Sequence, residues 1–253
     1  MQAKTVDFQS FTESVPAALN AVGANERLPG RKPILLKPNL VTAAPHPVTT
    51  AAECCRAVIQ YLRQAGADEI VIAEGTGDPC ESTSDVFDKL GYTRLARELK
   101  VALVDLNTQA CIRHERPDFP RLPELYLPEI ANTHFIISLP VLKVHTLSQF
   151  TGSMKNMMGF APPAHYAGAG GIWNKAAFHR NLQQAIIDLN RYRSPDLTLM
   201  DASIGMPEQH LGGRCCDPPV GKLVAGYDAR AVDQASAGLL GLDWHKIGHL
   251  RDA

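Results

Sequence analysis

The chain has 253 residues, of which 45% are hydrophobic and 20% are charged, the composition of an ordinary globular protein. Its 25 Lys and Arg residues nearly balance its 26 Asp and Glu residues, so the net charge of −1 gives no general attraction to nucleic acid or to an anionic membrane. The first thirty residues show no export signal, and no apolar run approaches the roughly 20 residues that span a bilayer. We therefore expect a cytoplasmic protein that binds neither nucleic acid nor membrane.

Hydrophobic spacing predicts an alternation of helices and strands. Some segments repeat apolar residues at helical spacing, and short β-branched runs bounded by Gly or Pro are typical of buried strands. In chain order we expect a helix at 6–22, a strand at 33–37, a helix capped by Thr49 or Thr50 and ending at 65, a strand at 69–73, a helix at 85–99 with a break at Gly91, strands at 101–105 and 135–139, a helix at 178–192, strands at 196–200 and 222–226, and a helix at 229–240.

The order of these elements predicts the fold class. A strand, a helix and a second strand follow one another between residues 33 and 73, which is typical of a right-handed parallel crossover. The alternation predicts a single α/β domain over residues 1–253, with a largely parallel central sheet flanked by helices. Residues 111–128 are rich in proline and charge, and we assign them no element. The tail at 244–253 could pack on the sheet edge or on a second copy of the chain, as in a homo-oligomer.

Polar side chains follow several of the predicted strands directly. Open α/β sheets bind their ligands outside the carboxyl ends of the parallel strands. Any one of these side chains could serve the structure alone, but together they predict a shared site at one edge of the sheet. They are Lys37 and Asn39 after the first strand, Glu74 after the second, Lys143 and His145 after the fourth, and Asp201 after the fifth.

The stretch 138–160 holds most of the candidates. Pro140 cannot donate a hydrogen bond to a sheet, so the strand before it should end there and leave Lys143 and His145 beyond its end. His145 would act as a general acid or base because the pKa of histidine lies near neutrality. Lys143 and Lys155 would be its catalytic partners.

A short helix is expected to begin after Thr151 and Gly152 and to run from Ser153 to about residue 158. Free backbone amides at a helix start bind anions, so these three residues would contact the ligand. Lys155 and Asn156 lie in the same helix, and the lysine, with Lys37 and Lys143, would complement a phosphate or carboxylate. The predicted partner is therefore a small anionic molecule.

Residues 162–174 are rich in glycine and proline and too long for a routine connection, so we interpret them as a lid or binding loop. His165 lies within this segment and would face the ligand. His179 stands at the start of the next predicted helix and could reach the same cleft.

The motifs exclude several cofactors. None of the six cysteines forms a C-x-x-C pair, so neither a zinc ribbon nor a ferredoxin-type cluster is supported. The dinucleotide fingerprint is missing, which argues against NAD, and no Walker A loop is present. The nucleophile elbow is missing too, which argues against an esterase. Glu74 and Asp201 could orient His145, hold a lysine, or bind Mg²⁺ through oxygen ligands.

Five short motifs stand out in the sequence: LKPNLV at 36–41, KVH at 143–145, TGSMKNMMG at 151–159, DA at 201–202 and YDARAVD at 227–233. Together they resemble the domain-of-unknown-function family 362, over about residues 33–241. The family is largely uncharacterised, so the resemblance implies boundaries and site residues rather than a chemistry. Many relatives carry ferredoxin-type iron–sulfur clusters, which this sequence lacks, and the resemblance therefore implies an iron–sulfur protein as a partner.

Three functions are compatible with these residues. The first is an enzyme that acts on a small anionic metabolite by Lys/His acid–base chemistry, as an isomerase, lyase or transferase. The second is a non-catalytic module that binds an anionic ligand or docks with a redox partner. The third is a metal-dependent enzyme that uses His145 with Glu74 or Asp201. We favour the first.

Overall fold

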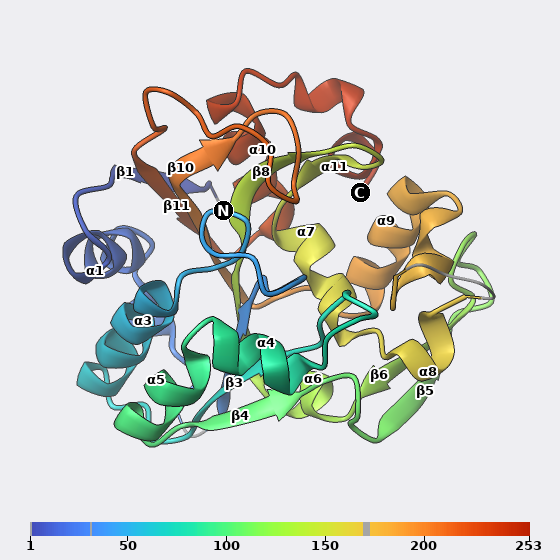
Figure 1. Ribbon diagram of the computed structural model, residues 1–253, viewed down its shortest axis with the longest axis horizontal. Coiled ribbons are helices and arrows are strands. Elements are labelled where there is room, and N and C mark those ends of the chain that lie inside the picture. The colour runs from blue at the N-terminus through green and yellow to red at the C-terminus, as the bar shows by residue number, and fades with distance from the viewer. Residues whose placement is uncertain (1, 31, 169–172) are drawn as a thin grey trace.

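The computed structural model describes residues 2–30, 32–168 and 173–253, and within them a nine-stranded sheet and a separate hairpin form (Figure 1). The main sheet has the strand order β1-β11-β10-β7-β2-β3-β4, and β8 and β9 attach beside β10. The strands are β1 (Lys4–Asp7), β2 (Ile34–Pro38), β3 (Ile70–Glu74), β4 (Ala102–Asp105), β5 (Cys111–Glu115), β6 (Glu124–Pro128), β7 (Phe135–Leu139), β8 (Val141–His145), β9 (Gln149–Thr151), β10 (Leu197–Met206) and β11 (Lys222–Gly226).

The centre of the sheet is parallel, as predicted. Strands β10, β7, β2, β3 and β4 all run in the same direction, so their carboxyl ends lie at one edge. Strand β11 is the one strand of the main order with the opposite direction, and it is antiparallel to both of its neighbours, β1 and β10. The chain is thus a mixed α/β domain whose mostly parallel sheet is flanked by helices.

Helices cover both faces of the sheet (Figure 1). Side chains alternate between the faces of a strand, so Leu35 joins one apolar core while Ile34 and Leu36 join the other. Helices α1, α3 and α5 pack on the second core, and α9 and α10 on the first. The α-helices are α1 (Phe11–Ala21), α2 (Ala24–Arg27), α3 (Ala52–Gln64), α4 (Thr83–Lys89), α5 (Tyr92–Leu99), α6 (Ile130–Thr133), α7 (Ser153–Asn156), α8 (Pro163–Tyr166), α9 (Leu182–Tyr192), α10 (Ala229–Leu239) and α11 (Gly248–Arg251), and the 3-10 helices are η1 (Met157–Phe160), η2 (Ala176–His179) and η3 (Trp244–Lys246).

Most predicted elements appear within a few residues of their expected bounds, and Gly91 does break the helix predicted at 85–99. Its φ of 79° is left-handed, which glycine adopts without strain, and α5 starts directly after it. No helix in the described part of the chain is both long and apolar enough to cross a membrane.

Two local predictions are corrected, and two segments contain strands that the sequence did not predict. Residues 4–7 are a strand rather than the start of a helix, because they pair with β11 from the far end of the chain. Residues 111–128, left unassigned, contain the β5–β6 hairpin, and a new strand, β8, begins directly after Pro140. Thr50 does not cap α3, since its hydroxyl donates to Leu139 O and accepts from Asn39 N.

Candidate functional site

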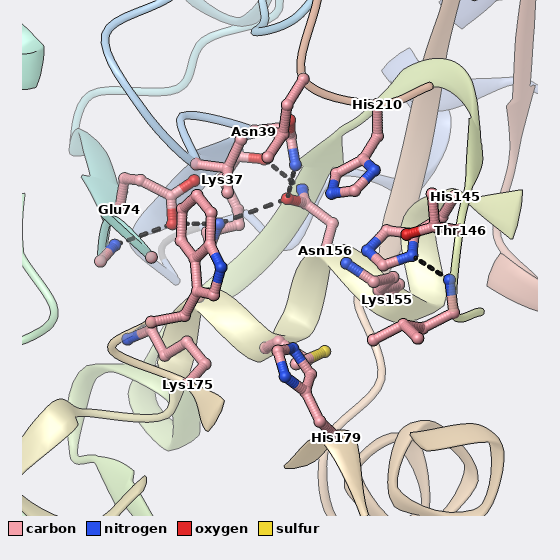
Figure 2. Close-up of a pocket in the computed structure, with 18 residues that line it drawn as sticks. Lys37, Asn39, Glu74, His145, Thr146, Lys155, Asn156, Lys175, His179 and His210 are labelled. Carbon is pink, nitrogen blue, oxygen red and sulfur yellow. Dashed lines mark hydrogen bonds and ion pairs between the residues drawn. The ribbon is translucent and has the colours of Figure 1, made fainter. Parts of the chain in front are cut away.

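A cavity of about 200 Å³ opens at the carboxyl ends of the parallel strands (Figure 2). Its walls come from the loops after β2 and β3, from the β8–β9 turn, from α7 and η1, from the segment at 173–179 and from the loop after β10. Parallel packing thus brings most of the predicted site residues together. The predicted residues that line it are Lys37, Asn39, Glu74, His145, Lys155, Asn156 and His179.

A buried ion pair forms part of the cavity floor. Lys37 Nζ lies 2.6 Å from Glu74 Oε1, and both side chains are almost fully buried. Glu74 also accepts hydrogen bonds from the amides of Leu40 (2.8 Å) and Gly75 (2.7 Å). Of the three roles predicted for Glu74, the structure shows that of holding a lysine. Gly159 covers the pair so closely that a Cβ there would overlap with both charged groups.

Lys143 lies beneath the cavity rather than at its surface. Its ammonium donates to Asn39 Oδ1 (3.0 Å), to the carbonyl of Val48 and to that of His210 (3.4 Å). Burial, followed by the charge of Lys155, lowers the pKa of Lys143 to about 7. The geometry therefore gives Lys143 the task of joining two loops, the one between β2 and α3 and the one after β10, and the structure does not bring it to the cavity as a catalytic group.

Lys155 presents an amine to the cavity without a polar partner. It stands in α7, and within the described residues no atom accepts a hydrogen bond from it and no carboxylate neutralises it. Burial alone lowers its pKa to about 8, so protonated and neutral forms are both accessible near neutral pH. Figure 2 shows the Lys155 amine next to the ring of His145.

The short helix that carries Lys155 is fixed from below. Asp233, buried in α10, accepts hydrogen bonds from the amides of Ser153 (2.6 Å) and Met154 (2.9 Å). The prediction that these amides are free to bind an anion is therefore wrong, because a carboxylate of the chain already occupies them. Thr151, Gly152 and Ser153 do not line the cavity, and their contacts position α7.

His145 is held in one tautomer. Its Nδ1 accepts hydrogen bonds from the amides of Leu147 (3.0 Å) and Ser148 (3.3 Å), so its proton is carried by Nε2. Burial and the charge of Lys155 lower the pKa of His145 far below its ordinary value. This corrects the expectation of a pKa near neutrality: the imidazole stays neutral and offers an N–H donor.

Two lining residues, Lys175 and His210, carry chemistry that the sequence analysis did not assign. His210, in the loop after β10, stacks on His145 with ring centroids 3.8 Å apart, and burial lowers its pKa to about 4. Lys175 donates to Asn107 Oδ1 and to the carbonyl of Ala161, and burial lowers its pKa to about 7. Trp173 lies at the end of the predicted lid. His210 follows a strand end, and that position was the one available signal for it.

Two predicted site residues have other partners. Asp201 binds His46 (Oδ2 to Nε2, 2.9 Å) and the amide of Ser203, and it does not line the cavity. His165 is exposed and stacks on Tyr126 with centroids 4.0 Å apart. The lid predicted at 162–174 includes the short helix α8, and its residues 169–172 lie outside the described residues.

The described residues contain no group of three or more His, Cys, Asp or Glu side chains that could hold a metal ion. Glu74, the one carboxylate that lines the cavity within these residues, has both oxygens engaged by Lys37 and by backbone amides. Mg²⁺ would have to displace that lysine, so the donor set does not fit it.

Comparisons with known proteins agree with the motifs. The family described as "Domain of unknown function (DUF362)" matches residues 34–238, which confirms the resemblance. No curated protein matches the chain. Among solved structures, the chain is similar to the lactate racemase apoprotein from Thermoanaerobacterium thermosaccharolyticum, with 14% identity and a TM-score of 0.56. The match covers 95% of this chain and 56% of that one, so this chain spans little more than half its length. At this identity the likeness concerns the fold, which is one that an enzyme uses.

Proposed function

The chain belongs to the DUF362 family, and we propose that it is an enzyme that binds a small carboxylate- or phosphate-bearing metabolite and transfers protons to or from it. One observation carries this proposal: Lys155 faces the cavity without a partner among the described residues. Lys155 is half-buried, an ammonium withdrawn from water without a counter-charge is costly, and an anionic ligand would supply that charge.

The groups around Lys155 support acid–base chemistry. The Nε2–H of His145 can donate a hydrogen bond to a ligand oxygen and stabilise developing negative charge. The rings of His179 and His210 have no hydrogen bond to a described residue and line the same end of the cavity, so they can accept and return a proton. Lys155 itself can serve as acid or base because its pKa lies near 8.

The shared fold suggests which anions to test first. The similar structure is named as a lactate racemase, and lactate is a small carboxylate. Lactate, propionate, pyruvate and inorganic phosphate therefore form the first set of ligands. Isomerase, lyase and transferase reactions on such molecules all remain compatible with the cavity.

A thermal-shift titration tests the proposal. A ligand that binds only the folded chain raises its melting temperature by mass action. We expect at least one anion to raise it in the wild type and in the control Lys246→Met, whose lysine is exposed, and to have no effect on Lys155→Met. Lys143→Ala is a poor probe, because it would also detach two loops.

Two results would count against the proposal. If no anion raises the melting temperature, or if the increase survives in Lys155→Met, the cavity is not the anion site. An anion that binds through Lys155 but is never converted would favour the alternative of a non-catalytic binding module.

A further inference from the structure

Lys155 differs from the other lysines around the cavity. Lys37, Lys143 and Lys175 each donate to two or three oxygens, which fixes their ammonium groups in place. Lys155 has no such acceptor within the described residues, and its charge acts on the imidazoles of His145, His179 and His210 and on the ammonium of Lys143. An amine that is desolvated and close to other basic groups is an activated nucleophile.

We propose that Lys155 forms an imine with a small aldehyde or ketone that also carries a carboxylate or phosphate. This inference rests on the proposed function, because the same cavity holds the anion. It adds that the metabolite carries a carbonyl carbon, and that the reaction passes through a covalent intermediate.

The groups needed for this step are present. Because the pKa of Lys155 lies near 8, its ammonium can release a proton to water near neutral pH, and the free amine then attacks the carbonyl carbon. As the C–N bond forms, the C=O π bond opens toward oxygen, and a proton moves from nitrogen to oxygen to give the carbinolamine. The proton released at the start is returned from water to the hydroxyl, the C–O bond breaks, and water leaves. An ammonium and a carbonyl compound thus become a protonated imine and water, with atoms and charge balanced.

His145 and Lys175 would assist from two ends of the cavity (Figure 2). The Nε2–H of His145 can donate to the carbonyl oxygen as negative charge develops on it, since Nδ1 is engaged by backbone amides. Lys175 uses two of its three N–H groups on described acceptors, and the third can bind the carboxylate of the ligand.

Reductive trapping tests the imine directly. The full chain is incubated with pyruvate or glyoxylate near neutral pH, reduced with borohydride, digested and analysed by mass spectrometry. A pKa near 8 instead of 10.5 raises the free-amine fraction by roughly a hundredfold. We therefore expect Lys155 to be labelled at least about tenfold more than the exposed Lys246, with the mass of one reduced keto acid.

Two variants separate the imine from simple anion binding. Lys155→Arg keeps a positive charge without a nucleophilic amine, so it should still be stabilised by propionate but should not be trapped. Lys246→Arg should be trapped like the wild type. Labelling is mapped on the wild-type chain, so the result does not depend on how well a variant folds.

Each outcome bears on a distinct claim. If propionate and pyruvate both stabilise the wild type but borohydride leaves Lys155 unlabelled, the imine is refuted and the proposed function stands. Labelling confined to exposed lysines also refutes it. If no anion stabilises the chain and no label appears, both proposals fail together.

Discussion

The buried pair of Lys37 and Glu74 gives the sharpest test of how the cavity floor is held. Glu74→Gln keeps the shape of the side chain but leaves the Lys37 ammonium buried, fully covered and without its counter-charge at 2.6 Å. Removing one partner of a buried pair typically costs about 3–5 kcal/mol. For a chain of this length that lowers the melting temperature by about 6–20 °C.

A second substitution shows how much of this loss is due to the stranded charge. Lys37→Met together with Glu74→Gln removes both charges, and such exchanges are often close to neutral. One backbone amide, that of Leu40 or Gly75, then lacks its carboxylate acceptor, which costs about 1–3 kcal/mol. We therefore expect the double variant to be more stable than Glu74→Gln alone.

Urea unfolding of the variants at several pH values completes the test. Burial already lowers the pKa of Lys37, and loss of Glu74 lowers it further. Below the ordinary lysine pKa, the folded variant then binds fewer protons than its unfolded chain. The loss of unfolding free energy in Glu74→Gln, relative to the wild type, should therefore shrink as pH rises. Glu98→Gln, which opens an exposed pair with Arg56, serves as control and should cost only about 0–1 kcal/mol. If the double variant is no more stable than the single one, the stranded charge is not the cause.

Three further predictions concern the surroundings of the cavity. Gly159→Ala should lower the free energy of unfolding by about 1–3 kcal/mol, because its Cβ would overlap with Glu74. Gly238→Ala, in open space on α10, should raise the free energy of unfolding by about 0.4–1 kcal/mol. Equal effects of the two substitutions in urea unfolding would contradict this. The melting-temperature increase caused by propionate should shrink as pH rises through about 8, where Lys155 loses its proton, and an increase unchanged up to pH 9 would exclude Lys155 as the cation. Burial raises the pKa of Asp233 to about 7 from 3.8, so the folded chain binds more protons than the unfolded chain between these two pH values. The contribution of Asp233 to the free energy of unfolding should therefore fall as pH rises from about 3.8 to about 7. Asp233→Asn should flatten this dependence in urea unfolding, and an unchanged profile would refute the assignment.

The fold was largely predictable because its signals are local. The buried strands at Ile34–Pro38 and Ile70–Glu74 are short apolar runs, and the helix between them supplies the parallel crossover. Polar residues at their ends could therefore be placed at one edge of the sheet from the sequence alone. The strand at Lys4–Asp7 could not, because it is mostly exposed and exists only through pairing with residues more than 200 positions away.

The candidate site was predictable in position but not in its charge state. Lys37, Lys143 and Lys155 look alike in the sequence, but their surroundings differ. Lys37 is paired with a carboxylate, Lys143 joins loops, and Lys155 has no hydrogen-bond acceptor among the described residues. Which of these applies depends on partners far away in the chain. Lys175 and His210 were missed for the same reason, since each enters the cavity from a loop whose path has no periodic signal.

One ammonium group also bears on how the molecule folds. Lys143 binds oxygens of Asn39, Val48 and His210, which are 104, 95 and 67 residues away in the sequence. Contacts of such separation require long loops to close first, and they form late. We expect the helices and the β5–β6 hairpin to be in place before the loops that hold these three residues meet around Lys143. The ability to bind a ligand should therefore appear only in the last phase of refolding, which makes ligand binding a measure of complete folding.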